Sequence, residues 1–536
     1  MEIEGVAVTP ECPTCPVWAR LEASQSRVAE LEAQLASLQG QKAALGEIAF
    51  HHSERQPRME PVDADTAANG GDSGRGHERG QRRGRPGHGR RQHPELPTVD
   101  VVLEPSHDDL HCATCGAPFV QIAGEQVSEE IRRRVIYERV VTHRPRYVPS
   151  CDCSGNPAVR TASPPPKVIP KGELAPGILA DLLVNKFDLS IPLERSLRLF
   201  AYEGLYLAKG SVTGMFQSML PLFEPVYAAT REHLLLAGIW NVDETRWLVF
   251  VDQKHKWWMW GAVGPDVVIY VIDPHRNADA LHRLLPEKLA GLGIVIADRY
   301  VVYGPRSLDP EHYLIQYCWV HLRRDFVRAA RADAALQPWS LGWLQRIRTL
   351  FHLERQRRHA MAEHGQDSQA YRQADAALRS WVLGIRRTLS AQLNAAASSR
   401  AFDVLHSFDE RFANYITFLD HPGVPLDNNA AERALRTPVL GRKNFYGSRA
   451  VWAVHQAEML ESIFATLRRN GLSPLAWTRA FLTACAENRG QPLADITRFL
   501  PWQMSDADRR AWALPPELCA QSWGTHRARD GLEQAG

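Results

Sequence analysis

The sequence contains no long hydrophobic run, although 44% of its 536 residues are hydrophobic. A helix that crosses a lipid bilayer needs about 20 consecutive apolar residues, and no segment approaches that length. The N-terminus also lacks a basic stretch followed by an apolar one, which is the pattern of a secretory signal. We therefore expect a cytoplasmic protein that does not associate with membranes.

The chain also has little net charge and no cysteine pattern typical of disulfides. Its formal net charge is +2, and its nine cysteines are odd in number, with six of them in close pairs. Close cysteine pairs favour metal binding over a disulfide framework. A chain of this length exceeds a single hydrophobic core, so several domains are expected.

Residues 1–50 predict an oligomerisation helix. Apolar residues recur at the two seam positions of a heptad, with Leu21, Val28 and Leu35 at one and Leu31, Leu38 and Leu45 at the other. This pattern is typical of a coiled coil between copies of a chain, and it indicates a homo-oligomer. The alternative is a single amphipathic helix that packs on its own protein.

Residues 51–98 predict a disordered, arginine-rich linker, because apolar residues are rare there. Arg83 and Arg85 belong to an Arg-Gly-Arg-Pro segment. That tetrapeptide resembles the hooks by which arginines enter the minor groove of A·T-rich DNA. The alternative is a basic tether that binds phosphates without sequence preference.

Residues 99–163 predict a small zinc-binding module. Cys112 and Cys115 form one close pair, and Cys151 and Cys153 form another. Four thiolates from two such pairs suit a closed structural zinc site. The alternating apolar pattern between the pairs indicates β-strands. Reduced cysteines without a metal are the alternative.

Residues 164–236 predict a series of helices. Between residues 198 and 213 the helical pattern is interrupted at Gly204, and Ser211 or Thr213 can cap a second helix. The arrangement resembles a helix-turn-helix, although many small helical hairpins share it. DNA reading and plain packing are both compatible with the pattern.

Residues 237–448 predict the catalytic domain of a multidomain α+β protein. Strands are expected at 239–251, 256–263, 267–272, 293–298 and 313–320, with a helix at 278–289. Three antiparallel strands, a helix and further strands follow one another in the order of the ribonuclease-H-like fold. Residues 326–420 predict a helical insertion, residues 449–490 predict C-terminal helices, and residues 491–536 form the tail.

Three acidic residues distinguish this domain. Asp243 lies within a buried strand, Asp298 ends a second strand, and Glu432 lies in the first turn of a helix. A carboxylate in a buried strand needs a binding partner, and in the expected fold these two strands are neighbours. We expect the three carboxylates to hold two Mg²⁺ or Mn²⁺ ions, about 3.5–4 Å apart, for phosphoryl transfer on DNA.

Each of these acids also has a structural alternative. Asp243 could pair with Arg246 or Arg299 in the protein interior. Asp298 could cap the turn after its strand. Glu432 could instead belong to a capping box at the start of its own helix.

Basic residues accompany the acids. His321 and Arg324 follow a strand end, Arg433 shares the helix of Glu432, and Arg442 and Lys443 lie in a segment predicted as a loop, residues 441–448. These side chains suit contacts with a DNA backbone. A solvated basic surface is the alternative for each.

These residues lie in motifs that resemble the transposases of the insertion sequence 66 type, a branch of the Asp-Asp-Glu transposases. The shared motifs are Val242–Thr245, Ala297–Asp298 with Tyr303–Gly304, Cys318–His321 with Arg324, Asp427–Arg433 with Arg442–Asn444, Ser462–Thr466 and Asn470–Pro474. The likeness covers nearly the whole chain. It departs from the family pattern in the bulky stretch 298–303 and in the tail after Gly490.

The resemblance implies a DNA transposase that cuts at 3′ ends and joins them to target DNA, with Asp243, Asp298 and Glu432 as metal ligands. Its implied partners are the terminal repeats of an element, target DNA and helper proteins of the same element. Two alternatives stay open. One is a ribonuclease-H-like nuclease without strand transfer, and the other is a non-catalytic, zinc-containing DNA-binding protein.

Overall fold

The computed structural model describes residues 97–515 and residue 518, with gaps at 107, 122–126, 129, 151–158, 252–255 and 396–397. The chain divides into two compact units, residues 54–136 and the remainder, and each is described by itself. The predicted coiled coil of residues 1–50 lies outside the described residues, as do Arg83 and Arg85.

The described residues between 97 and 164 contain little regular structure. The described part of the smaller unit contains one 3₁₀ turn, η1 (Asp108–Leu110), and a bridge between His111 and Pro118. In the larger unit, β1 (Arg146–Tyr147) pairs antiparallel with β2 (Arg160–Thr161). The longer alternating strand predicted between the cysteine pairs is wrong, because the rest of that stretch finds no partner strand among the described residues.

Four helices follow. They are α2 (Pro176–Phe187), α3 (Leu193–Tyr202), α4 (Lys209–Ser218) and α5 (Leu220–Leu236). A short turn joins α3 to α4, and its Gly204 has a φ of +96°, a conformation that favours glycine. A helix, a turn and a second helix are present as predicted, but Ser211 and Thr213 lie inside α4 and do not cap it.

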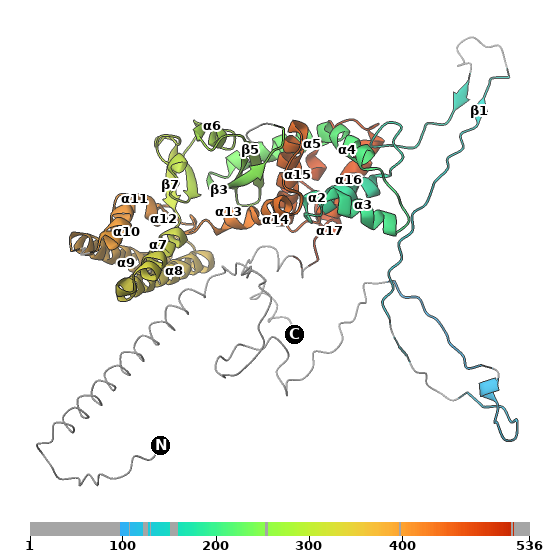
Figure 1. The fold of residues 1–536 in the computed structure, drawn as a ribbon, viewed down its shortest axis with the longest axis horizontal. Coiled ribbons are helices and arrows are strands. Elements are labelled where there is room, and N and C mark those ends of the chain that lie inside the picture. Colours follow the sequence, from blue (N-terminus) through green and yellow to red (C-terminus); the bar gives the residue numbers. More distant parts are fainter. Residues whose placement is uncertain are drawn as a thin grey trace, which may run out of the picture. The chain divides into compact units, whose positions relative to one another are not determined.

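A five-stranded mixed sheet forms the centre of the larger unit (Figure 1). Its strands are β3 (Ile239–Leu248), β4 (Lys256–Val263), β5 (Val268–Asp273), β6 (Gly293–Ala297) and β7 (Tyr313–Tyr317). They lie in the order β5-β4-β3-β6-β7. β3, β4 and β5 are antiparallel, whereas β6 runs parallel to β3 and β7 runs parallel to β6. The five predicted strands are confirmed, although β3 and β7 end earlier than predicted.

The edge strand β5 is covered by α15 (Val451–Arg469). The main-chain N–H groups of Val268 and Tyr270 donate to Thr466 Oγ1 (3.0 Å) and Ser462 Oγ (2.8 Å). Because these hydroxyls lie one helical turn apart on α15, they match alternate residues of the strand. The Ser462–Thr466 motif thus satisfies a sheet edge that would otherwise be open.

The remaining helices pack on this sheet or, as in residues 337–394, on other helices to one side of it (Figure 1). They are α6 (Ala278–His282), α7 (Trp319–Ala332), α8 (Gln337–His364), α9 (Gln369–Asn394), α10 (Ser399–Asp409), α11 (Phe412–Tyr415), α12 (Thr417–Asp420), α13 (Asn429–Ala434), α14 (Arg436–Phe445), α16 (Pro474–Glu487) and α17 (Asp506–Ala511), with 3₁₀ turns η2 (Val301–Tyr303), η3 (Ala334–Leu336) and η4 (Thr497–Phe499). The helical pattern predicted for residues 326–420 is confirmed, and α6 is shorter than predicted.

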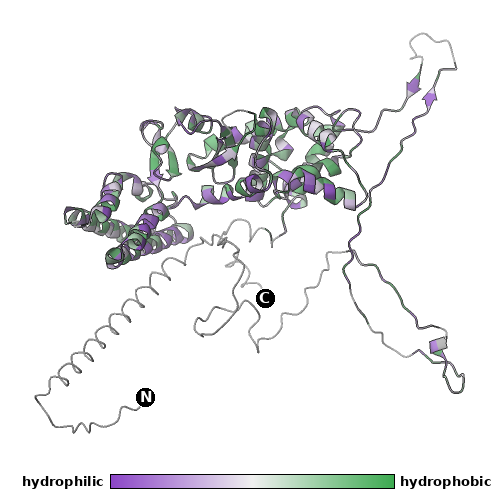
Figure 2. Cartoon of the chain, in the orientation of Figure 1, coloured by the Kyte–Doolittle hydropathy of each residue, from purple (hydrophilic) through white to green (hydrophobic). Residues whose placement is uncertain are grey.

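Hydropathy follows this arrangement. Figure 2 shows hydrophobic residues concentrated in the central sheet and mixed with hydrophilic residues along the helices, as expected for a sheet covered by amphipathic helices. Among the described helices, none is long and apolar enough to cross a lipid bilayer.

Candidate functional site

Asp243 lies on β3, and Asp298 directly follows the neighbouring parallel strand β6. In the register of β3 and β6, Ile239 is opposite Ile294 and Asn241 is opposite Ile296. Continuing that register by two residues places Asp243 beside Asp298, which directly follows β6. Neighbouring strands lie about 4.8 Å apart, so the two carboxylates belong to one site.

Each aspartate commits one oxygen to the main chain. Asp243 Oδ1 accepts a hydrogen bond from the Glu244 N–H at 2.9 Å, and Asp298 Oδ1 accepts one from the Tyr300 N–H at 2.8 Å. The second oxygen of each carboxylate receives no hydrogen bond from any residue that the structure describes. Asp298 therefore does cap the turn after β6, yet it keeps an oxygen for a ligand.

Asn428 fixes the start of α13, the helix that carries Glu432, against the sheet. Asn428 Nδ2 donates to Val242 O (2.8 Å), and its Oδ1 accepts from Asn241 Nδ2 (3.0 Å). Its main-chain N–H donates to Cys318 Sγ (3.2 Å) at the start of α7. The residue is 1% exposed. One buried residue therefore joins β3, the start of α7 and α13, through its side-chain amide and its main-chain N–H.

The three predicted acids act on one another electrostatically. Burial, the neighbouring Glu244 and the charges of Asp298 and Glu432 raise the pKa of Asp243 to about 8. The hydrogen bond from the Glu244 N–H only partly offsets this rise. Repulsion of this kind between carboxylates is what a bound divalent cation relieves.

Two of the structural alternatives are wrong. Within the described part of the chain Asp243 makes no ion pair, and Arg299 pairs instead with Asp325 of α7. A capping box on α13 is excluded because the Asn428 N–H is directed to a sulfur atom and the Asn429 N–H donates to Asp427 Oδ1 at 3.1 Å.

The carboxylates fit a divalent cation in chemistry, although they are not gathered around one point. Carboxylate oxygens suit Mg²⁺ or Mn²⁺, and Asp243 and Asp298 each have one uncommitted. Across the described residues, however, no group of three or more His, Cys, Asp or Glu side chains is arranged to hold a metal ion. Glu432 Oε1 instead lies 3.5 Å from Arg324 Nη2 and 3.7 Å from His321 Nε2.

His321 and Arg324 are the two predicted cations that the structure brings to the acids. Both project from the first turns of α7 toward Glu432. Burial and the charge of Arg324 lower the pKa of His321, so the imidazole is neutral at pH 7. The positive charge beside Glu432 therefore comes from Arg324.

Arg433 follows Glu432 in the sequence, but no ion pair joins it to an acid among the described residues, whereas His321 and Arg324 both lie near Glu432. After burial, the charge of Arg433 contributes to lowering the pKa of Arg469 on α15.

The stretch predicted as a DNA-binding loop, residues 441–448, is mostly helical. α14 continues to Phe445, and Arg442 Nη1 donates to Thr245 Oγ1 on β3 at 3.3 Å. Lys443 is exposed on the same helix. The loop prediction was wrong because contacts with β3 hold this stretch in a helix.

Glu244 is a second buried acid at the site, and sequence reasoning missed it. Its side chain is 2% exposed and accepts hydrogen bonds from Arg276 Nε (2.8 Å) and from the Tyr303 hydroxyl. The Arg276 guanidinium lies 3.7 Å from the centre of the Tyr300 ring. Tyr303 belongs to a motif that the sequence analysis singled out, so its contact with Glu244 could have been suspected. Nothing in the local sequence pattern identified Arg276 as a further partner of Glu244.

Only one of the two cysteine pairs lies in the described residues. Cys112 and Cys115 flank a tight turn in which the Gly116 N–H donates to Cys112 O at 2.8 Å. Main-chain hydrogen bonds within this turn lower the pKa of the Cys112 thiol, which favours the thiolate that binds metals. Cys151 and Cys153 lie outside the described residues.

Asn428→Ala is expected to separate α13 from the sheet. The substitution removes the side-chain hydrogen bonds to the Val242 carbonyl and to Asn241, which keeps only its bond to Asp427 O at 3.2 Å; losing a partner costs about 1–3 kcal/mol for a buried group. Asn429→Ala is the matched control, because the Asn429 side chain makes no hydrogen bond among the described residues. Thermal unfolding of the two variants should separate them, and equal losses would contradict the role given to Asn428.

These observations define a mixed α/β protein whose central sheet brings acidic side chains to one site. The family model described as transposase IS66 family matches residues 171–456, slightly more than half of the 536 residues. The chain belongs to the transposase IS66 family, as its motifs predicted. Asp243, Asp298 and Glu432 all lie within the matched region.

Similarity to individual proteins extends beyond that region. "Uncharacterized protein y4hP" of Sinorhizobium fredii (strain NBRC 101917 / NGR234) is 26% identical over 444 residues, which cover 76% of this chain and 75% of that protein. "Uncharacterized protein y4jD" of the same strain is 26% identical over 438 residues, which cover 76% of this chain and 80% of that protein. No solved structure matches this chain.

Proposed function

We propose that this protein is a DNA transposase that cuts the 3′ ends of its element and joins them to target DNA by metal-dependent phosphoryl transfer. The observation that carries the proposal is that the register of β3 and β6 brings Asp243 beside Asp298, within the region that matches the family. The charges of Asp298 and Glu432 both raise the pKa of Asp243, and carboxylates of this kind suit Mg²⁺ or Mn²⁺.

The strand order supports a ribonuclease-H-like assignment for the catalytic domain. An antiparallel β3-β4-β5 unit is followed by β6 and β7, which run parallel to β3. We assign the catalytic domain to residues 237–448 with its insertion at 326–420. The C-terminal helices then occupy 449–490, and the tail occupies 491–536.

In this mechanism, bound metal ions would activate the attacking oxygen and stabilise the leaving oxygen. Asp243 and Asp298 would contribute their uncommitted oxygens as ligands, and Glu432 would be the third ligand. Arg324, which now neutralises Glu432, lies where it can offset the negative charge that develops on the phosphodiester. His321 is neutral beside it and adds no repulsion between cations.

The parts of the chain outside the sheet receive supporting roles in this proposal. Residues 1–50 associate with a second copy of the chain, and residues 51–98 contact DNA through Arg83 and Arg85. Residues 164–236 form a helical DNA-binding region. Residues 99–163 form the zinc module, and helper proteins of the same element complete the assembly.

The zinc assignment predicts a measurable metal content. Purified protein is expected to contain about one zinc ion per chain, as a four-thiolate site would hold. Cys112→Ser is expected to lose it, whereas Cys485→Ala, which changes a buried cysteine of α16, is expected to retain it. Elemental analysis decides the matter, and equal zinc in both variants would exclude the Cys112 site.

The proposed function is tested with purified protein, a labelled duplex from the end of its element, a target plasmid, and Mg²⁺ or Mn²⁺. Joined product is the expected result. Cleavage without joining would favour a nuclease. DNA binding without metal-dependent cleavage, even after the helper proteins are added, would favour a non-catalytic DNA-binding protein.

A further inference from the structure

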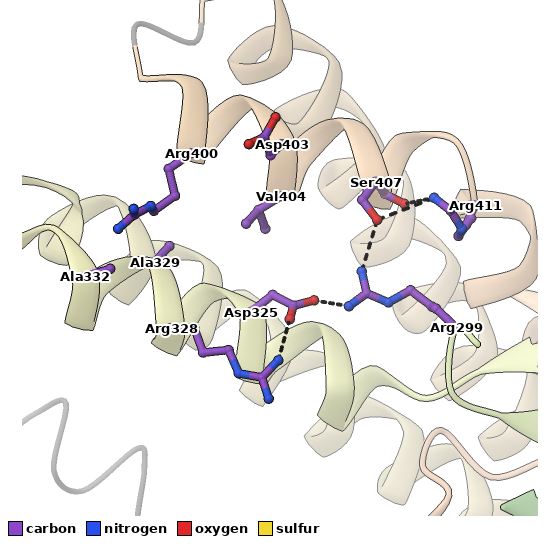
Figure 3. Close-up of a pocket in the computed structure, with 10 residues that line it drawn as sticks. All are labelled: Arg299, Asp325, Arg328, Ala329, Ala332, Arg400, Asp403, Val404, Ser407 and Arg411. Atoms are coloured by element: carbon purple, nitrogen blue, oxygen red, sulfur yellow. Dashed lines mark hydrogen bonds and ion pairs between the residues drawn. The ribbon is translucent and has the colours of Figure 1, made fainter. Parts of the chain in front are cut away.

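A cavity of about 570 Å³ lies between α7 and α10 (Figure 3). Ala329 of α7 and Val404 of α10 supply apolar lining. The charged lining consists of two aspartates and four arginines, Arg299, Arg328, Arg400 and Arg411. Positive charge therefore prevails in a cavity that also has an apolar part.

The arginines are unequally neutralised. Asp325 forms ion pairs with both Arg299 and Arg328, the latter at 3.5 Å, and Arg411 pairs with Glu410 at 2.9 Å. Arg400, by contrast, forms no ion pair or hydrogen bond with any residue that the structure describes. Asp403 is exposed one helical turn away on α10. Arg400 is exposed, so its guanidinium is accessible to a ligand from solvent, and phosphate is an anion that arginine binds well.

Ser407 supplies a further donor. Its Oγ accepts hydrogen bonds from Arg299 at 3.1 Å and from Arg411 at 3.4 Å, as Figure 3 shows. Because both lone pairs of the hydroxyl oxygen are then used, its hydrogen is available to donate. No acceptor for that hydrogen is present among the described residues. The cavity thus offers a hydroxyl donor in addition to its cationic groups.

α7 connects the cavity with the candidate catalytic site. Arg324, which contacts Glu432, precedes Arg328 by about one helical turn, or about 6 Å along the axis. A DNA strand advances about 3.4 Å per nucleotide, so this distance corresponds to about two nucleotides. Arg299 also directly follows Asp298 in the sequence.

We propose that this cavity receives the phosphate and sugar of one nucleotide of the DNA strand, a few nucleotides from the phosphodiester that is cut. The inference rests on the proposed function and adds a substrate contact to it. Arg400 and Arg328 neutralise the phosphate, Ser407 donates to one of its oxygens, and Val404 packs against the sugar. The volume lies within the range of pockets that bind small molecules.

The first test measures affinity for a labelled element-end duplex by fluorescence anisotropy, without divalent metal, so that no cleavage intervenes. Arg400→Gln is expected to weaken binding about tenfold at low salt and to reduce the slope of log affinity against log salt by about 0.9. The matched control is Arg387→Gln, which removes an exposed arginine of α9 outside the cavity and should change little. Asp403→Asn removes a repelling charge and should tighten binding.

The second test locates the contact. Single methylphosphonate groups, which remove one phosphate charge, are placed at successive positions near the cleaved bond. At one position the substitution should weaken binding of the wild type but should not weaken binding of Arg400→Gln further, as expected for two partners of one contact. Equal effects of Arg400→Gln and Arg387→Gln would overturn the inference, as would an Arg400→Gln variant with unchanged affinity, the result expected for an acidic protein segment as occupant.

The tests distinguish failure of the cavity proposal from failure of the proposed transposase function. A position-specific contact in a protein that binds the duplex but never cuts it would support the cavity and refute the transposase. Normal cleavage and joining with no effect of Arg400→Gln on affinity would refute the cavity alone. A wild type that binds no DNA would refute both.

Discussion

Asp243→Asn is expected to lower the rates of DNA cleavage and joining by at least about 10³-fold, equivalent to about 4 kcal/mol of activation free energy. The amide keeps the size of the carboxylate and can still accept the hydrogen bond from the Glu244 N–H. It removes the negative charge that a divalent cation needs at the centre of the sheet. DNA affinity measured without metal should stay unchanged, since no DNA contact is assigned to Asp243. Single-turnover assays on a labelled duplex provide the measurement.

Glu244→Gln is the control variant that distinguishes loss of a metal ligand from loss of any buried acid at this site. Glu244 is adjacent in sequence and buried, but its carboxylate is occupied by Arg276 and Tyr303. We expect it to reduce activity far less than Asp243→Asn does. The reverse order would mean that Glu244 is the metal ligand and that the assignment of Asp243 is wrong. Losses of equal size accompanied by reduced stability would indicate that both residues only maintain the fold.

The positions of the two aspartates could be predicted because a charged residue in an apolar, strand-like segment is unusual and can be recognised from the sequence alone. Asp243 interrupts an apolar run, and Asp298 ends another, and both patterns are local. Their register follows from pairing two strands whose lengths and order the sequence also indicated. The strands of the sheet could therefore be predicted from the sequence, because the spacing of apolar residues and the residue composition of a segment indicate a strand.

The contacts that hold Glu432 in place could not be predicted in this way. Asn428 lies among residues that commonly cap helices, and its local pattern favours that role. Its amide instead bonds to Val242, which is distant in the sequence, and only the tertiary fold brings the two together. Arg276 reaches Glu244 for the same reason.

Residues 441–448 were predicted as a loop, although α14 continues to Phe445. Glycine and polar residues favour a loop there, but the end of this stretch packs closely on β3. Gly447, which follows the end of α14, has a φ of +120°, and a Cβ at that position would collide with the Leu248 carbonyl oxygen. The glycine therefore permits the close approach to β3, a tertiary contact that the local pattern did not indicate.

The second large effect concerns stability in the absence of metal, which is expected to fall as the pH rises from about 4 to about 8. An aspartate in the unfolded chain ionises near pH 4, whereas the folded protein raises the pKa of Asp243 to about 8. Between these values the unfolded state has released its proton and the folded state has kept it, so rising pH favours unfolding. The loss amounts to at most about 5 kcal/mol, because partial exposure screens the charge.

The measurement is the midpoint of thermal unfolding in EDTA at a series of pH values. Asp243→Asn should flatten the decline, because the amide does not titrate. Added Mg²⁺ should restore much of the stability of the wild type at pH 8, since a bound cation favours the ionised carboxylate. It should have little effect on the variant.

Other groups titrate in the same experiment, and the comparison of wild type with variant removes them. His455 is the clearest, because hydrogen bonds to Glu458 and Glu224 raise its pKa to about 9. Its contribution is lost above that pH in both proteins and cancels in the difference. An identical decline in Asp243→Asn would show that another group controls the pH dependence. Equal stabilisation of both proteins by Mg²⁺ would place the bound cation away from Asp243, and the two-metal proposal would then lose its central ligand.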